Sequence, residues 1–343
     1  MPRTAIVLFN LGGPDRLEAV RPFLFNLFND RAIIDVPQPI RWLLAQRISR
    51  RRAPVAQEIY RQLGGGSPLV PLTEAQASAL EGVLGDDHRV FVCMRYWHPM
   101  APAMVQAVKA WRPDRIVLLP LYPQFSTTTS GSSLADWAAA AKAAGLGTPS
   151  QAVCCYPTEP GFVAAVAELI RPAYERAAQH GQPRLLFSAH GLPKKIIAAG
   201  DPYQDHVERS SAAVAQAADI AGLEWLVSYQ SRVGPLEWIG PSTDDEIRRA
   251  GADGRPLVVV PIAFVSEHSE TLVELDIEYR HLAEQAGVPA YERVAAVGTH
   301  PRFIAGLADL IRQTTGQGEA VCPGSGHRLC PDDRTGCPRG KRL

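Results

Sequence analysis

The sequence predicts an α/β protein of two similar Rossmann-like lobes. Each lobe is expected to hold a four-stranded parallel sheet flanked by helices, with the active site in the cleft between the lobes. Three observations predict this fold. Short β-rich runs alternate with Ala- and Leu-rich helical stretches, the 343 residues suffice for two domains, and three strand-end motifs of the first half recur in the second.

Eight strands are predicted, four in each half. They are 4–11, 88–96, 115–122, 150–156, 184–189, 224–230, 256–264 and 290–297. Each is a short run of mostly apolar residues, and the stretches between them are long enough for the helical crossovers that parallel strands require.

The repeated motifs set the predicted division of the chain. AIVLFNLGGP (5–14) parallels LLFSAHGLP (185–193), FVCMRYWHP parallels LVSYQSRVGP, and VLLPLYPQFS parallels VVVPIAFVS, in the same order. We therefore expect a lobe over 1–160, a second over 161–300, a helix over 301–316 packing back on a lobe, and a cysteine-bearing tail over 317–343.

Composition narrows the class of function. Hydrophobic residues make up 46% and charged residues 20%, which is typical of a globular protein. Lys+Arg and Asp+Glu both count 35, so no net positive field favours nucleic acid as a partner. The N-terminus does not resemble a signal peptide, and no apolar run approaches the roughly 20 residues of a membrane span. The protein is expected in the cytoplasm, either free or bound peripherally at the inner face of the plasma membrane.

A ladder of acidic residues follows the strand at 256–264. In SEHSETLVELDIEY, Glu270, Glu274 and Glu278 recur every four residues behind His268, so an α-helix would align them on one face. The helix is expected to bury Leu272, Leu275 and Ile277. The ladder is either a solvated face paired with Arg280 and His281, or a route for a divalent metal or protons, because carboxylates and imidazole suit a metal that must bind and leave.

Two further residues have equally open interpretations. His190 ends a strand in FSAHGLP, where it either caps a loop or acts as a base. Trp238, in GPLEWIGP, is either a packing plug or a platform for a flat apolar ligand. In open α/β sheets, ligands bind beyond the carboxyl ends of the strands, where His190 falls.

The segment 20–52 is apolar on too many faces for a simple surface helix. Phenylalanines, isoleucines and Trp42 precede Arg47, Arg50, Arg51 and Arg52. It is either a helical pair packed on the core or an exposed apolar lip with a basic edge, suited to a membrane surface or an amphiphilic anion.

Together, these motifs resemble the ferrochelatase family. The resemblance rests on FSAHGLP, SEHSETLVELDIEY, YQSRVGPLEWIGP, EIYRQLGGGSPL, FNLGGP and MRYWHP, in the family's order, and runs from about residue 4 to about residue 315. It implies the two-lobed chelatase-like fold and an enzyme that inserts Fe²⁺ into protoporphyrin IX to form protohaem, the terminal step of haem biosynthesis. Porphyrin and ferrous iron are then the expected substrates.

The resemblance also implies roles for single residues. His190 and Glu270 match the family's catalytic pair, and His268, Glu274 and Glu278 match the acidic line that, with that pair, handles metal. The positions implied around the porphyrin are Leu11, Arg52, Tyr60, Ser67, Arg95, Tyr96 and Trp238.

Other functions share parts of this pattern. A chelatase for coproporphyrin, or one inserting cobalt, would have the same fold, although we expect a cobalt chelatase to be shorter and to lack the long lip. A non-catalytic haem- or metal-binding protein would share the cleft without needing His190 opposite Glu270.

Six cysteines are present, and Cys322, Cys330 and Cys337 crowd the tail, each followed by Pro. The resemblance to ferrochelatases implies that these three cysteines bind a 2Fe–2S cluster together with one internal cysteine. This chain has Thr127 in the stretch where the best-known version carries that cysteine, so Cys154 or Cys155 is the substitute. Adjacent strand residues point to opposite faces, so only one of the two is expected to face the tail. Structural zinc with His327, or a tail of free thiols, is the alternative, and Cys93 is expected to be a core residue.

Overall fold

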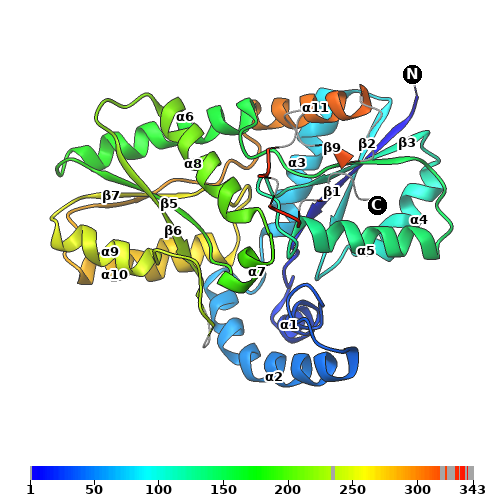
Figure 1. The fold of residues 1–343 in the computed structure, drawn as a ribbon, viewed down its shortest axis with the longest axis horizontal. Coiled ribbons are helices and arrows are strands. Elements are labelled where there is room, and N and C mark those ends of the chain that lie inside the picture. Colours follow the sequence, from blue (N-terminus) through cyan, green and yellow to red (C-terminus); the bar gives the residue numbers. More distant parts are fainter. Residues whose placement is uncertain are drawn as a thin grey trace. The chain divides into compact units, whose positions relative to one another are not determined.

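The computed structural model of the chain describes residues 2–232, 236–316, 321–322, 329–331, 333–336 and 338. These residues form two compact units (Figure 1). The first takes 2–155 together with 307–316, 321–322 and Pro338, and the second takes the described residues of 156–306 and 329–336.

The first unit contains a parallel sheet with the strand order β2-β1-β3-β4-β9. Its strands are β1 (Thr4–Asn10), β2 (His88–Met94), β3 (Arg115–Pro120), β4 (Ser150–Val153) and β9 (Val321–Cys322). Four of these strands were predicted, each slightly too long. The fifth comes from the tail, whose backbone at 321–322 pairs with Ala152 and Val153. The sequence did not predict it because two residues show no periodicity.

Helices cover this sheet on both faces. Those that pack on it are α3 (Leu69–Leu84), α4 (Ala101–Trp111) and α5 (Ser130–Ala143). A 3-10 turn (Leu17–Ala19), α1 (Val20–Phe28) and α2 (Gln38–Gln62) pack on one another instead. The core beneath α4 and α5 includes Val7, Phe9 and Trp137. Cys93 lies in the same core with 2% of its surface exposed, which confirms its predicted place.

The second unit repeats the topology of the first. Its parallel sheet has the order β6-β5-β7-β8, the counterpart of β2-β1-β3-β4. The strands are β5 (Arg184–His190), β6 (Glu224–Gln230), β7 (Leu257–Pro261) and β8 (Tyr291–Arg293). The repeated motifs therefore predicted the duplicated α/β architecture correctly. The predicted cleft between the lobes stays a prediction.

The helices of the second unit also lie on both faces of its sheet. They are α6 (Pro160–Ala178), α7 (Lys194–Ala198), α8 (Tyr203–Ala218), α9 (Thr243–Ala252), a π-helix (Glu270–Glu278) and α10 (Tyr279–Gln285). A core of Leu186, Val259 and Leu275 joins the sheet to α9, the π-helix and α10. The last helix, α11 (Pro301–Gly316), begins in the second unit and continues into the first from Leu307.

The lip is a pair of helices with one buried and one exposed side. Phe23 and Leu24 of α1 are buried in a cluster with Ala53 of α2. Ile40, Trp42 and Leu43 of α2 are exposed by 52%, 46% and 62%. The pair therefore has a buried side, as the first interpretation predicts, and an exposed apolar side, as the second predicts; the predicted contact with a membrane or an amphiphilic anion stays a prediction. In the described part of the chain, no helix is both long enough and apolar enough to cross a membrane.

Candidate active site

His190 is the last residue of β5, and its ring has a defined orientation. Its Nδ1 lies 2.7 Å from the carbonyl oxygen of Gly191, which can only accept, so Nδ1 carries the proton. Nε2 is then directed at Oε1 of Glu270, 3.7 Å away. The site therefore presents an imidazole nitrogen that can accept a proton or bind a metal.

Glycine at 191 is required by close packing. A Cβ there would lie 2.9 Å from the Gln230 carbonyl oxygen and 3.3 Å from the ring of Trp238. Trp238 is half-buried on the loop after β6 and pairs with Pro193 through an isolated antiparallel bridge. Its indole nitrogen is buried and has no hydrogen-bond partner among the described residues. The tryptophan thus lies beside the turn that carries His190.

Glu270 lies between two histidines. Its Oε2 is 3.5 Å from Nε2 of His268, and its Oε1 faces His190. Burial alone would raise the pKa of Glu270, but the positive charge of His190 when it is protonated, together with the hydrogen bond and charge of His268, outweighs burial and lowers the pKa to about 2. The carboxyl is therefore an anion at neutral pH and attracts cations.

The acid ladder lies on a π-helix over Glu270–Glu278, so the predicted α-helix was wrong in type. A π-helix closes hydrogen bonds one residue further along than an α-helix and is rare outside functional sites. The wider turn also changes which apolar residues are buried. Val273 and Leu275 are buried, whereas Ile277, predicted to point inward, is 47% exposed.

Glu274 is held by uncharged donors. Its carboxylate accepts hydrogen bonds from the Ser231 amide (2.9 Å), the Ser231 hydroxyl (2.6 Å), Gln230 (3.1 Å) and the Tyr279 hydroxyl (3.2 Å). Ser231 adopts a left-handed conformation with φ +59°, which aims both of its donors at the carboxylate. Burial and the charge of Glu270 raise the pKa of Glu274. Glu278, the third step of the ladder, is exposed.

In the first unit, Arg95 and Tyr96 follow β2 and belong to a closed polar network. Both contact Oδ2 of Asp30, at 3.0 Å from Arg95 Nη2 and 2.7 Å from the Tyr96 hydroxyl. The Ser132 hydroxyl donates to the same oxygen and accepts from Arg95 Nε. Asp30 and Ser132 were missed by sequence analysis, since 65 residues separate Asp30 from Arg95 and no local pattern links them.

The other porphyrin-site residues predicted from sequence also lie in the first unit. Leu11 and Tyr60 belong to the cluster that contains Tyr96, in which Tyr60 and Tyr96 are 7% and 1% exposed. Ser67 donates its amide to the Pro14 carbonyl at 2.7 Å, close against Gly13. Arg52 is exposed, with its guanidinium over the Phe28 ring.

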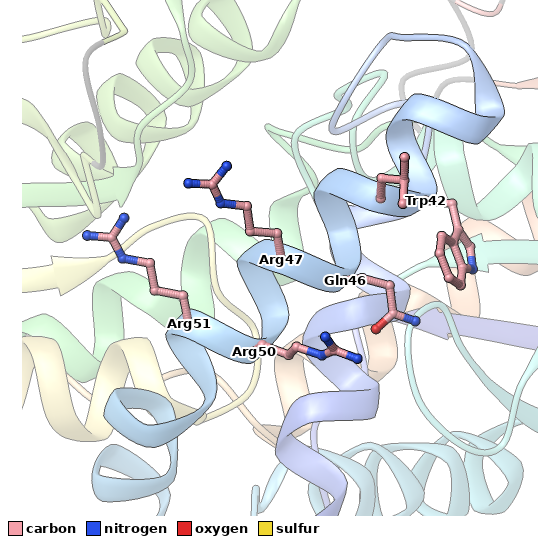
Figure 2. A pocket seen from close by; sticks show the side chains of 6 residues that line it. Trp42, Gln46, Arg47, Arg50 and Arg51 are labelled. Carbon is pink, nitrogen blue, oxygen red and sulfur yellow. The ribbon is translucent and has the colours of Figure 1, made fainter.

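The exposed side of α2 carries a hollow of about 660 Å³. It is lined by Trp42, Leu43, Gln46, Arg47, Arg50 and Arg51. Figure 2 shows Arg47 and Arg51 projecting from one side of the helix, and Gln46 and Arg50 from the other side, beside Trp42. Apolar and basic groups are therefore combined on one helix.

The cysteines predicted to hold a cluster fall in both units. Strand β4 ends at Val153, so Cys154 and Cys155 lie beyond it, and their Sγ atoms are 3.6 Å apart rather than on opposite faces as predicted. Cys330 is buried with Sγ 3.3 Å from Nε2 of His206. Burial lowers the pKa of His206 to about 4, so its imidazole is neutral.

The remaining predicted metal ligands fall partly outside the description. The backbone of Cys322 pairs with Val153 in β9, while Cys337 and His327 lie outside the described residues. Within the described ranges, no group of three or more His, Cys, Asp or Glu side chains is arranged to hold a metal ion.

Comparison with known proteins connects this geometry to a family. Residues 3–315 match the family model described as Ferrochelatase. Proteins named ferrochelatase from Caulobacter vibrioides and Phenylobacterium zucineum are 54% and 56% identical to this chain. The first alignment covers 98% of this chain and 97% of the relative, and the second covers 90% of each.

Solved structures resemble the fold at low sequence identity. SirB from Bacillus subtilis with Fe³⁺ matches with a TM-score of 0.50 at 13% identity, covering 92% of this chain and 98% of that one. A sirohydrochlorin chelatase SirB in complex with cobalt, from subspecies spizizenii, matches with a TM-score of 0.52 at 11% identity, covering 92% and 97%. These likenesses support the two-lobed chelatase fold.

Proposed function

The chain belongs to the ferrochelatase family, the porphyrin chelatases that insert ferrous iron in haem biosynthesis, and we propose that its porphyrin is protoporphyrin IX. The observation that carries the reaction is the approach of His190 Nε2 to Glu270 Oε1 at 3.7 Å. An imidazole nitrogen that can accept a proton then lies beside a carboxylate that attracts cations, and we propose that metal insertion uses both groups.

The reaction exchanges two pyrrole protons for one Fe²⁺. We propose that His190 Nε2 accepts the two pyrrole protons in turn, while the anionic Glu270 attracts the cation and stabilises the imidazolium that forms. His268 and Glu274 continue the route away from the site. A ring bent out of plane exposes its nitrogen lone pairs, so a rigid apolar wall that holds the bent ring would favour the transition state.

The proposed porphyrin contacts divide by chemistry. Leu11, Tyr60 and Trp238 offer apolar surface, Ser67 a hydroxyl, and Arg52 a cation for the propionates. Arg95 and Tyr96 are largely committed to Asp30, so we propose that they act on the porphyrin by supporting the wall around Tyr60.

The choice of protoporphyrin rests on the apolar lip, because coproporphyrin carries more carboxylates. Anaerobic incubation with Fe²⁺ and each porphyrin, followed through the Soret band, tests the choice. We expect a higher kcat/KM for protoporphyrin. Faster turnover of coproporphyrin would reverse the assignment, turnover with cobalt alone would indicate a cobalt chelatase, and no turnover would indicate a binding protein.

We propose peripheral membrane association through α2, at the inner face of the membrane where anionic lipids gather. Ile40, Trp42 and Leu43 are exposed next to the arginines of the hollow, and each basic residue near such a surface contributes about 1 kcal/mol. In a flotation assay with phosphatidylserine liposomes, the wild-type protein should float with the liposomes and the Ile40→Ser, Leu43→Ser double variant should not. Val83→Ser is the control, since Val83 is exposed on α3. Equal flotation of all three proteins would exclude this role.

We propose that the tail holds a 2Fe–2S cluster through Cys322, Cys330, Cys337 and one of Cys154 and Cys155. Thiolates are the donors that such clusters use, and β9 pairs the backbone of Cys322 with the residue before Cys154. A bound cluster exchanges single electrons and cross-links the segments that hold it.

The colour of anaerobically purified protein tests this cluster. We expect red-brown protein whose visible absorption is lost in Cys330→Ser and retained in the core control Cys93→Ser. Colourless protein with one zinc and no acid-labile sulfide would overturn the cluster in favour of zinc.

A further inference from the structure

Arg293 connects two carboxylates of the acidic segment. It is the last residue of β8, and its side chain is 10% exposed. Nη1 lies 2.6 Å from Oε1 of Glu267, and Nη2 lies 2.5 Å from Oδ2 of Asp276. One guanidinium therefore ties together two positions that are nine residues apart in the chain.

These two positions enclose the proposed catalytic stretch. Glu267 directly precedes His268, and Asp276 lies in the π-helix after Glu270 and Glu274. Fixing Glu267 and Asp276 to β8 thus fixes the backbone on both sides of the residues that face His190.

Strand β8 makes further contacts with the same segment. The Tyr291 hydroxyl donates to the Leu275 carbonyl at 2.7 Å, and Arg280 Nη1 donates to the Tyr291 carbonyl at 2.8 Å. The Ala296 amide donates to Glu267 at 2.9 Å. A π-helix has little intrinsic preference over an α-helix, so such tertiary contacts are needed to hold its register.

Arg293 also separates the carboxylates into two kinds. Glu267 and Asp276 share the cation of Arg293, and Asp276 Oδ1 also lies 3.8 Å from Nη2 of Arg280. Among the described residues, Glu270 and Glu274 have no ion pair with Lys or Arg; Glu270 faces only histidines, and Glu274 only uncharged donors. Arg293 therefore provides a positive charge for the carboxylates that anchor the π-helix, here called the clamp. The carboxylates of the proposed metal route, Glu270 and Glu274, stay available to a cation.

The geometry of Arg293 is that of a bridge between two carboxylates rather than of a bidentate pair with one carboxylate. A guanidinium can bind one carboxylate through two parallel hydrogen bonds. Here each Nη serves a different acid, and Arg293 Nε and Glu267 Oε2 are buried without a hydrogen-bond partner in the described part of the chain. Leaving buried polar atoms unpaired is unfavourable, so this arrangement is not the one that pairing alone would select.

We propose that Arg293 is a positioning residue for metal insertion: it holds the π-helical register that sets Glu270 against His190. This inference rests on the proposed function.

The second unit supplies a matched control for loss of a buried clamp. Arg184, the first residue of β5, also contacts two carboxylates, Glu224 at 2.5 Å and Asp253 at 2.9 Å, with its side chain 8% exposed. It lies at the opposite end of the parallel sheet from His190. Arg184→Met should therefore report the cost of breaking a clamp without disturbing the acid route.

The test compares Arg293→Met, Arg293→Lys and Arg184→Met by kcat, porphyrin affinity and hydrogen exchange. Loss of an outer positioning group typically costs 10–100-fold in activity. We expect Arg293→Met to lower kcat by that amount with porphyrin affinity unchanged, and to speed amide exchange over 267–278. The kcat of Arg293→Lys should lie between those of wild type and Arg293→Met, because an ammonium group pairs well with only one of the two carboxylates. Arg184→Met should lose as much stability as Arg293→Met but keep the wild-type kcat.

A triple variant covers the case in which two partly buried carboxylates that have lost Arg293 prevent folding. Arg293→Met with Glu267→Gln and Asp276→Asn removes the clamp and its charges together, and it should also be slow. Wild-type kcat in either folded variant would overturn the positioning role. An inactive wild-type enzyme would instead refute the proposed function, which separates the two failures.

Discussion

The two units share one topology but differ in the chemistry beyond their strands. In the first unit, the Asp30 carboxylate accepts hydrogen bonds from one guanidinium and two hydroxyls, which include the two residues that follow β2. After β6 in the second unit, the Glu274 carboxylate binds Gln230, Ser231 and Tyr279, all uncharged. Their partners Arg95 in the first unit, and Gln230 and Ser231 in the second, lie at the carboxyl ends of β2 and β6, where open α/β sheets place their ligands.

The counter-ion decides what each carboxylate can do. Burial raises the pKa of Asp30, but its hydrogen bonds to Ser132 and Ala32 and the charge of Arg95 outweigh it, so the pKa is lowered. Burial and Glu270 raise the pKa of Glu274. An acid with its own cation is a structural tie, whereas an acid without one can receive a cation or a proton. The comparison therefore assigns structure to the first cluster and chemistry to the second.

The largest expected effect comes from the pair His190 and Glu270, which precedes Glu274 in the proposed route. His190→Ala and Glu270→Gln should each abolish metal insertion while leaving porphyrin affinity largely intact, because in the proposed mechanism both act on protons or metal rather than on the apolar ring. The Soret band reports insertion, and quenching of tryptophan fluorescence reports porphyrin binding. Wild-type turnover in either variant would contradict the assignment.

Breaking the first cluster should instead cost stability. Removing one partner of a buried ion pair typically costs about 3–5 kcal/mol, and Asp30→Asn retains only part of the hydrogen bonding around Arg95. We expect urea unfolding to show a loss at the lower end of that range, with only a mild loss of turnover per folded molecule through weaker support of the wall around Tyr60. Asp136→Asn is the milder control, since that acid lies 3.6 Å from Arg95 and is more exposed. A large loss of turnover in folded Asp30→Asn would give this cluster a direct catalytic role.

Local patterns predicted much of the fold and the residue types of the site. The eight strands and the pairing of His190 with Glu270 follow from runs, motifs and a family resemblance, all of which are visible along the chain. The π-helix was missed because its register depends on Arg293 and Tyr291, which lie outside the helix. The positions of Cys154 and Cys155 were misjudged because the strand ends one residue before them.

Contacts between distant residues account for most of what was missed. Asp30 precedes an ordinary loop, and only the folded chain shows that Arg95, Tyr96 and Ser132 converge on it. Such ion pairs have no periodicity, so a single sequence does not reveal them. The same holds for the division of the acidic segment into clamped and open carboxylates.

A smaller effect is expected at the exposed end of the ladder. Glu278→Gln should slow metal insertion by no more than a few-fold, because Glu278 is exposed and water already screens its charge. Steady-state kinetics at low and high salt would check this, with Glu274→Gln for comparison. A loss as severe as that of Glu270→Gln would extend the chemical cluster to the end of the π-helix.

The smallest effect is a pair of opposite pH slopes in stability. The folded pKa of Glu274 is raised above its usual 4.5, so ionisation costs stability as pH rises through that raised value. Relative to wild type, Glu274→Gln should therefore gain stability as pH rises from 4.5 to that raised pKa and then level off, whatever constant cost its altered hydrogen bonds add. The folded pKa of Asp30 is lowered below 3.8, so its contribution is complete above that value and is lost as pH falls through the folded pKa. Asp30→Asn should accordingly lose stability relative to wild type as pH rises from 3 to 5. Urea unfolding across this range measures both slopes. If the stability difference from wild type changed with pH in the same direction for both variants, the pKa values of Glu274 and Asp30 would not be shifted in opposite directions.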